Sequence, residues 1–241
     1  MDMSEQEPSW EWGEYFIGTI PASIVFRGNV VGLCDIIESQ NDANDTINKT
    51  AEVCFIGLVA YFEAFFKDHF ASLINICPEL LKELKNRRQD VTVDAADLLV
   101  LEDNLKHKLG FLLAERYDFG TAKHINSLYH SLLLVTPFSK DEAARYDQIL
   151  SDRNLLVHHG GTYTMRYFEQ RLATESPSSQ IFSHSLVVTK GTFLSTLSFL
   201  ESIVLKTIKA TQTALFNYIE AHNILLDEPR ETAINYLAAW M

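Results

Sequence analysis

The sequence predicts an all-α fold, a bundle of helices in a single domain. Apolar residues recur at helical spacing over several long stretches, and capping residues, glycines and prolines stand at the ends of those stretches. The chain has 241 residues, of which 47% are hydrophobic, so it can bury a sizeable core. The first 14 residues contain five acidic residues and no basic one. We therefore expect an acidic arm over 1–14, with Trp10 and Trp12 docking on the protein, and one helical domain over 15–241.

The first strong helical pattern begins near Asn44. The stretch NDTINKTAEVCFIGLVAYFEAFFKDHFASLINICP offers Asn and Asp as capping residues at its start and Pro78 as a stop. Its middle, 53–66, is apolar on nearly all sides, which is typical of a central helix covered by its neighbours. More helical sequence runs through Arg116, and GTAKHINSLYHSLLLVTP predicts a short helix that ends before Pro137.

The next helix has clear boundaries. In FSKDEAARYDQILSDRNLLVHHGG, Ser139 and Glu142 have the spacing of a capping box, and Gly160 and Gly161 supply a stop that tolerates positive φ. After it, TYTMRYF and SQIFSHSLVV are rich in aromatic and β-branched residues, which predicts a small β-hairpin insertion. A long helix from Lys190 to about His222 and a short one that ends at Trp240 complete the chain.

Composition limits the classes of function. The net charge of −12 and the pI near 5.1 argue against a protein that holds nucleic acid by bulk electrostatics, so any such contact must be local. No apolar run reaches the roughly 18 to 20 residues that cross a bilayer, and the N-terminus is acidic where a signal peptide would be basic. We expect a soluble, cytoplasmic protein without membrane contact. Cys34, Cys54 and Cys77 lie far apart, which favours reduced core thiols over a disulfide framework.

One arginine stands among apolar positions of the helix that follows Ser139. At about 100° per residue a single stripe contains Tyr146, Leu150, Arg153 and Val157. A charge on such a stripe is costly unless it is paired or lines a cavity. Glu63 is the one ionisable residue within 53–66, so it is the expected partner, in a pair that could serve structure alone. The alternative for Glu63 is a surface pair with Lys67.

His158 lies on a polar line beside this stripe. It follows Arg153 by five residues, so on a straight helix the two side chains point about 140° apart with a rise of about 7.5 Å. Either the arginine bends toward the polar line, or a second copy of the helix completes the site across a two-fold axis. We favour the second arrangement, because the first leaves His158 with little shelter from solvent.

These residues resemble the signature of the HEPN superfamily, all-α domains in which an arginine, a polar residue, a few mostly apolar residues and a histidine follow one another. Here the residues are Arg153, Asn154, Leu-Leu-Val and His158. The capped helix before them, the hairpin and long helix after them and the earlier AYFEAFFKDHF segment extend the resemblance to stand-alone prokaryotic members over about 44–215. In members paired with a nucleotidyltransferase a tyrosine stands two positions after the histidine. Gly160 stands there instead, so regulation by tyrosine modification is not implied.

The resemblance implies an HEPN-like helical bundle with the activity of a metal-independent endoribonuclease, such as a toxin or phage-defence effector, without a cofactor. His158 suits proton transfer near neutral pH, and the planar donors of Arg153 suit the extra charge of a phosphorane-like transition state. Asn154 would orient either group or contact phosphate. Attack by the RNA 2′-hydroxyl predicts cyclic-phosphate ends and no cleavage of DNA. The implied partners are RNA, a second copy in a homodimer, and a cognate antitoxin or regulatory protein.

Residues near the motif are candidates for supporting roles. His159 would share the proton transfer or cap the helix end. Arg145, Arg166 and Tyr163 are candidates for RNA binding, because the segment 140–171 carries five basic and five acidic residues and is neutral within an acidic chain.

Two other interpretations stay open. A non-catalytic HEPN module that binds a partner protein or a nucleotide would use Arg153 for the fold. A helical ligand-binding or regulatory domain unrelated to HEPN would be monomeric, with His158 facing open solvent. The remaining histidines, His124 and His130 among them, are interpreted as ordinary surface or core residues, and no Ser-His-Asp arrangement or metal cluster is recognisable.

Overall fold

The computed structural model describes residues 10–39, 48–101, 105–171 and 184–240. Within these ranges the secondary structure is helical, and the only β pairing is one isolated antiparallel bridge between Thr162 and Ser185. The predicted all-α class is therefore confirmed.

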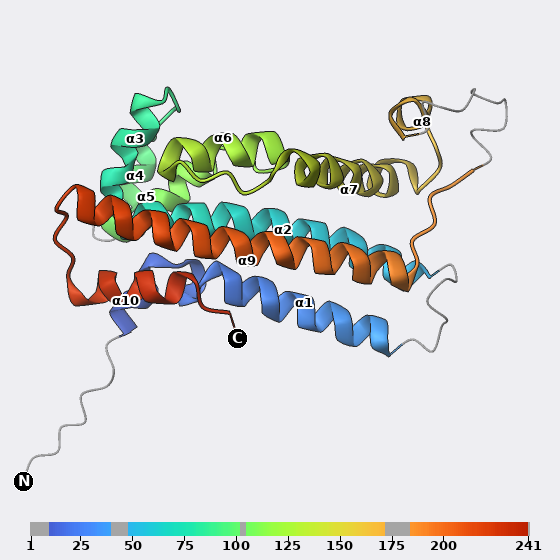
Figure 1. The fold of residues 1–241 in the computed structure, drawn as a ribbon, viewed down its shortest axis with the longest axis horizontal. Helices are drawn as coiled ribbons and strands as arrows, with labels where there is room; N and C mark the ends of the chain where they lie inside the picture. The colour runs from blue at the N-terminus through green and yellow to red at the C-terminus, as the bar shows by residue number, and fades with distance from the viewer. Residues whose placement is uncertain (1–9, 40–47, 102–104, 172–183, 241) are drawn as a thin grey trace, which may run out of the picture.

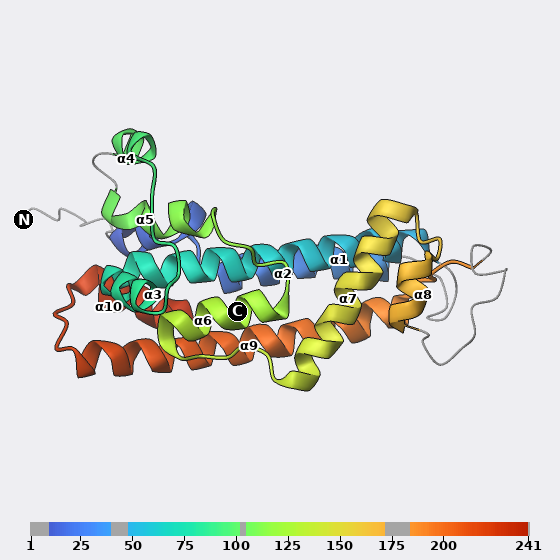
Figure 2. The same ribbon diagram turned by 90° about the horizontal axis from the view of Figure 1, so that it is seen from above.

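Two long helices form the centre of the molecule and lie side by side (Figures 1 and 2). In Figure 1, α1 and α10 lie below this central pair, and α6 and α7 lie above it. The central helices are α2 (Lys49–Ile76) and α9 (Lys190–Ala221), and the flanking ones are α1 (Ala22–Glu38), α10 (Glu228–Leu237), α6 (Ala122–Leu133) and α7 (Lys140–His159).

Shorter elements cover the two ends of this bundle. α5 packs along the C-terminal half of α2 and contacts α4, and α8 packs against α7 at the opposite end of the bundle (Figure 2). These elements are η1 (Trp10–Tyr15), η2 (Ile17–Thr19), η3 (Pro78–Leu80), α3 (Leu81–Asn86), α4 (Ala95–Leu101), α5 (Leu105–Ala114) and α8 (Met165–Arg171).

Side-chain caps set several helix starts close to the predicted positions. Asn48 caps α2, and Thr189 caps α9 by accepting from the amide of Thr192. α2 ends before Cys77 and Pro78, where a proline cannot continue the helix. The long helix predicted from Lys190 ends at Ala221, one residue before the expected end.

Aromatic rings fill the space between α2 and the helices on either side of it. Phe62 contacts Phe26 of α1 and Tyr146 of α7, with ring centroids 6.2 and 5.1 Å apart. Deeper along α2, His69 is buried and shares a 2.8 Å hydrogen bond with Thr211 of α9. Burial lowers the pKa of His69 to about 3, so this ring is neutral and belongs to the core.

The prediction that α2 is a central helix covered on most sides is confirmed for 53–66, although one side of this stretch is exposed. Val53 is 68% exposed and Tyr61 is 37% exposed, and Ala60 and Ala64 are exposed as well. The stretch 69–76 is buried throughout, and Gly110 of α5 contacts Ala71 and Asn75 there. Among the described residues, the first half keeps an uncovered apolar face, defined by Val53, Ala60, Tyr61 and Ala64.

The first strand of the predicted hairpin is wrong. Met165–Arg171 forms α8, whose first turn is capped by Thr164, with Tyr167 and Phe168 buried. Thr164 offers a capping oxygen at a helix start, and this local signal outweighs the strand preference of the aromatic residues. The second strand lies partly outside the described residues, and its described part contributes only Ser185 to the isolated bridge.

The end of the expected acidic arm that the structure describes packs on the bundle. Trp10–Tyr15 forms η1, and the Trp12 ring stacks on Tyr236 of α10 with centroids 4.3 Å apart. The backbone carbonyl of Tyr15 accepts a hydrogen bond from Asn75 of α2. The rest of the arm, 1–9, lies outside the described residues.

Among the described helices, α9 alone is long and apolar enough to cross a membrane by length and composition. Half of its most apolar window is buried inside the molecule. A core helix passes the same test, and α9 packs against α1, α2, α6 and α10.

Gly110 marks the closest approach of α5 to α2. Its amide donates a 2.7 Å hydrogen bond to Asn75 Oδ1, and a Cβ at this position would lie far inside van der Waals contact of the Ala71 carbonyl oxygen. Gly28 of α1 is a suitable control position, since a Cβ there would meet nothing within 4 Å.

We expect Gly110→Ala to lower the free energy of unfolding by about 1–3 kcal/mol, because α5 must shift away from α2. Gly28→Ala should raise it by about 0.4–1 kcal/mol, because alanine loses less backbone entropy in a helix. Urea unfolding of both variants measures the two effects. Equal effects of the two substitutions would contradict the close α2–α5 contact.

Candidate active site

The helix that carries the arginine is fixed at both ends, as predicted. Ser139 Oγ accepts from the Glu142 amide, and Glu142 Oε2 accepts from the Ser139 amide at 2.7 Å, which completes the capping box. Gly160 ends α7 in the left-handed region at φ 57°.

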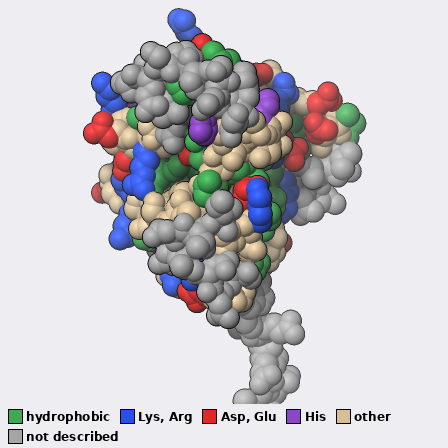
Figure 3. Space-filling view, turned by 90° about the vertical axis from the view of Figure 1, so that its right-hand side faces the viewer, with side chains coloured by type: hydrophobic (Ala, Val, Ile, Leu, Met, Phe, Trp, Pro, Cys, Tyr) green, Lys and Arg blue, Asp and Glu red, His purple; other side chains and the backbone are tan. Residues whose placement is uncertain are grey.

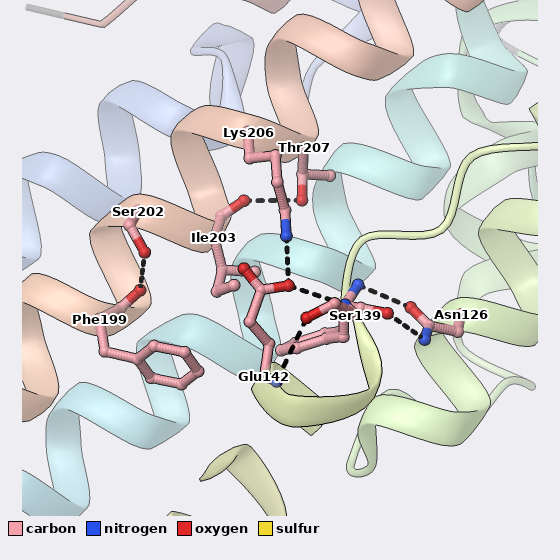
Figure 4. A network of polar contacts seen from close by, with 9 residues as sticks. Asn126, Ser139, Glu142, Phe199, Ser202, Ile203, Lys206 and Thr207 are labelled. Carbon is pink, nitrogen blue, oxygen red and sulfur yellow. Dashed lines mark hydrogen bonds and ion pairs between the residues drawn. The ribbon is translucent and has the colours of Figure 1, made fainter. Parts of the chain in front are cut away.

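The start of α7 is also tied to neighbouring helices (Figure 4). Lys206 of α9 donates to Glu142 Oε2 at 2.5 Å. Asn126 of α6 exchanges two 2.9 Å hydrogen bonds with the backbone of Phe138. Partial burial opposes ionisation of Glu142, but the hydrogen bonds from Lys206 and Ser139 lower the pKa of its carboxyl below the ordinary value. The capping carboxylate therefore stays charged.

Arg153 and Glu63 form the predicted ion pair. Arg153 Nη2 donates to Glu63 Oε1, which joins α7 to α2. Their side chains are 23% and 25% exposed, so both charges are mostly withdrawn from water. Burial raises the pKa of Glu63 above its ordinary value, and the attraction and hydrogen bond of Arg153 oppose this shift only in part. The ionised state of each side chain is therefore stabilised by the other.

One position of the predicted apolar stripe is wrong. Tyr146 and Leu150 are buried, whereas Val157 is 49% exposed. Near the end of α7 the buried residues are Leu155 and Leu156 instead, and α8 packs on the side of the helix that carries Asp152, whose carboxylate accepts a hydrogen bond from Tyr167.

A cleft of about 870 Å³ opens beside the ion pair. Its walls come from α2, the start of α6, α7 and α8. Histidine surface is visible at the end of the molecule that carries α8 (Figure 3). The predicted site residues that line the cleft are Glu63, Arg153, Asn154, His158, His159 and Arg166.

The cleft brings Arg153 and His158 to one cavity within a single chain. A two-fold partner is therefore not needed to gather them, although we favoured that arrangement from the sequence. Asn154, His158 and His159 are exposed, as expected for the arrangement within one chain.

Two predicted RNA-binding residues lie outside the cleft lining. The Arg145 guanidinium stacks over the Phe199 ring at 4.3 Å and donates to the Ser195 carbonyl, so it holds α7 on α9. Tyr163 packs its ring against Tyr167, with centroids 5.1 Å apart, and its amide donates to the carbonyl of His184.

The cleft also contains residues that sequence reasoning missed. Lys123 and His124, in the first turn of α6, lie in the wall, and His124 Nδ1 is 2.6 Å from Asp118 Oδ2. The signal available in the sequence was Thr121, a capping residue that places His124 at the start of a helix. Nothing in the local pattern indicated that α6 begins next to the C-terminal half of α7.

The charges of the lining are mixed. Lys123, Arg153 and Arg166 face Glu63 and Asp147, so cationic groups slightly outnumber carboxylates in a chain with a net charge of −12. Within the described residues, no three His, Cys, Asp or Glu side chains gather into a group that could hold a metal ion.

No family model, curated protein or solved structure matches this chain. The resemblance to HEPN domains therefore depends on Arg153, Asn154 and His158 in their helical setting and stays a prediction.

Removing Arg153 should make stability depend more strongly on pH. In Arg153→Met the charge and hydrogen bond that lower the pKa of Glu63 are gone, so burial raises this pKa further. A raised pKa in the folded state gives stability that is present at low pH and is lost as the pH rises through it. We expect the variant to lose about 1–3 kcal/mol relative to the wild type near neutral pH, and less near about pH 4.

Urea unfolding at several pH values measures this difference. The double variant Glu63→Gln/Arg153→Met is the control, since it contains no carboxyl at this position and should lose the added pH dependence. If the single and double variants respond alike to pH, Glu63 does not depend on Arg153.

Proposed function

We propose that this chain is a metal-independent endoribonuclease of the HEPN type, such as a toxin or phage-defence effector, that cleaves RNA by attack of the 2′-hydroxyl. The observation that carries the proposal is that Arg153, held by Glu63, lines the same cleft as His158 and Asn154.

The chemistry follows from the residue types. In transesterification the 2′-oxygen attacks phosphorus and the 5′-oxygen leaves, with charge building on the non-bridging oxygens. A guanidinium already fixed by a carboxylate can stabilise this charge without reorganising. An imidazole in the cleft can move a proton at neutral pH, and the Asn154 amide can donate to a phosphate oxygen.

The cleft suits a short single-stranded segment. Its volume of about 870 Å³ lies in the range of pockets that enclose small ligands, which admits nucleotides but not a duplex. Lys123 and Arg166 lie at its walls and can contact phosphates, so attraction is local in an otherwise acidic protein.

A homodimer is part of the proposal. His158 and His159 are exposed, and α2 keeps its uncovered apolar face of Val53, Ala60, Tyr61 and Ala64. Glu63, on the same part of α2, lines the cleft. A second copy seated on this face would bury apolar area and would narrow the access of water to the cleft.

A second candidate is a non-catalytic module that binds a partner protein or a nucleotide. The observation that favours it is that Arg153 Nη2 is engaged by Glu63, as expected of an arginine that serves the fold.

Purified wild-type protein should cleave RNA in the presence of EDTA and leave cyclic-phosphate ends. We expect His158→Ala to lower the rate by about 10²–10⁴-fold with little change in melting temperature, because general acid–base catalysis contributes that much. His130→Ala is the matched control, since His130 is exposed on α6 and does not line the cleft. Cleavage products are measured on labelled RNA.

Two outcomes would contradict the nuclease proposal. RNA that stays intact with wild-type protein, or cleavage that survives both His158→Ala and Arg153→Ala, would exclude these residues as a nuclease site. A lower melting temperature of Arg153→Ala without any RNA cleavage by the wild type would favour the non-catalytic module.

Tyr61→Arg should turn the dimer into a monomer, because it places a charge in the uncovered apolar face of α2. Light scattering measures the mass in solution. Phe216→Arg on α9 is the control, since Phe216 is similarly exposed, at 41% against 37%, and lies on another helix. A wild-type protein that is monomeric at high concentration would refute the dimer.

A further inference from the structure

A second histidine with a carboxylate behind it lies in the cleft. His124 is in the wall, and its Nδ1 is 2.6 Å from Asp118 Oδ2. Asp118 is not part of the lining, so it supports His124 from behind. Because Nδ1 is engaged by the carboxylate, Nε2 is the nitrogen left for proton transfer.

Backbone groups fix both members of this pair. The Gly120 amide donates to Asp118 Oδ1 at 2.7 Å, and the His124 amide donates to Thr121 Oγ1 at 3.2 Å. The hydrogen bond from Gly120 and the contact with His124 lower the pKa of the Asp118 carboxyl below its ordinary value, against a smaller effect of burial. Asp118 is therefore ionised at neutral pH.

The pair is electrostatically close to the arginine site. Glu63, Arg153 and His124 line the same cleft, and the charge of Asp118 contributes slightly to the raised pKa of Glu63. The cleft thus holds two groups that are each backed by a carboxylate, Arg153 by Glu63 and His124 by Asp118.

The proposed reaction needs two proton transfers. A base must remove the proton from the 2′-hydroxyl, and an acid must give one to the 5′-oxygen as it leaves. His158 alone can perform only one of these at a time. His124 and His158 come from different helices, α6 and α7, and both line the same cleft.

We propose that His124 is the general base of the reaction, with Asp118 as its positioning residue, and that His158 is the general acid; this rests on the proposed function. A carboxylate that holds an imidazole fixes its tautomer and stabilises the imidazolium that forms on proton uptake, which suits the base.

The reaction moves two protons, forms one bond to phosphorus and breaks one. His124 Nε2 accepts the 2′-hydroxyl proton, and the 2′-oxygen–phosphorus bond forms. The phosphorus–5′-oxygen bond breaks, and His158 gives its proton to that oxygen. The products are a 2′,3′-cyclic phosphate and a 5′-hydroxyl, with no electron transfer and no other reactant.

A substrate with a better leaving group separates the two roles. An oligonucleotide that the wild type cleaves at one mapped linkage is made with oxygen or with sulfur as the bridging 5′ atom. A thiolate leaves without protonation, so the sulfur substrate needs a base but no acid. We expect the cleavage rate of His158→Ala to be about 10²–10⁴-fold below the wild-type rate on the oxygen substrate. On the sulfur substrate most of this loss should disappear. The cleavage rate of His124→Ala should be about 10²–10⁴-fold below the wild-type rate on both substrates.

Further variants keep the experiment decisive. Asp118→Asn should lower kcat with KM unchanged, and His130→Ala should match the wild type on both substrates. The side chains of His124 and Asp118 are 51% and 62% exposed, so these variants should fold, which circular dichroism verifies.

His124→Gln gives a second test of the base with a side chain of similar size, and added imidazole should restore part of the activity of His124→Ala.

The outcomes distinguish this proposal from the nuclease proposal. If His124→Ala cleaves at the wild-type rate while His158→Ala does not, the nuclease stands and the role of His124 is refuted. If the sulfur substrate restores His124→Ala, His124 is not the base. If the wild type cleaves neither substrate, both proposals are wrong.

Discussion

The ion pair between Glu63 and Arg153 connects the fold to the candidate site. Each charge is about three-quarters withdrawn from water, at 25% and 23% side-chain exposure, and would be costly without the other. The pair fixes where α7 lies along α2, since a shift by one turn would leave both groups without a partner. The cleft beside it is lined by both residues of the pair, by His158 of α7 and by His124 of α6.

Much of this arrangement could be predicted from local sequence. The bounds of α2, α7 and α9 follow from capping residues, glycines and prolines, which act through neighbouring backbone groups. The partnership of Glu63 and Arg153 could be predicted although 90 residues separate them. Each was the single charge in an apolar surrounding, so each needed the other.

The residues that were missed or misplaced in the site depend on how the helices pack. The sequence offered only the Thr121 cap as a signal for His124, because the place of His124 in the cleft depends on α6 starting beside α7. Arg145 was expected in the site, but its position on α7 directs it to Phe199 of α9. The prediction for Val157 was wrong for the same reason, whereas the first strand of the hairpin was wrong because the local Thr164 cap starts a helix there. α8 folds against the last turn of α7 and changes which side of the helix is buried.

α7 has its capping contacts and its chemistry at opposite ends, with the Glu63–Arg153 pair between them. Its 20 residues span about 30 Å, with the contacts of Glu142 and Lys206 at the start and His158 in the last turn. His158 lies 16 residues beyond Glu142, about 24 Å along the helix, so a rotation of about 5° about the capped end would carry His158 through about 2.1 Å. Displacements of about 1 Å already change reaction rates greatly. The Glu63–Arg153 pair stands only five residues before His158, so it holds the imidazole against such a rotation.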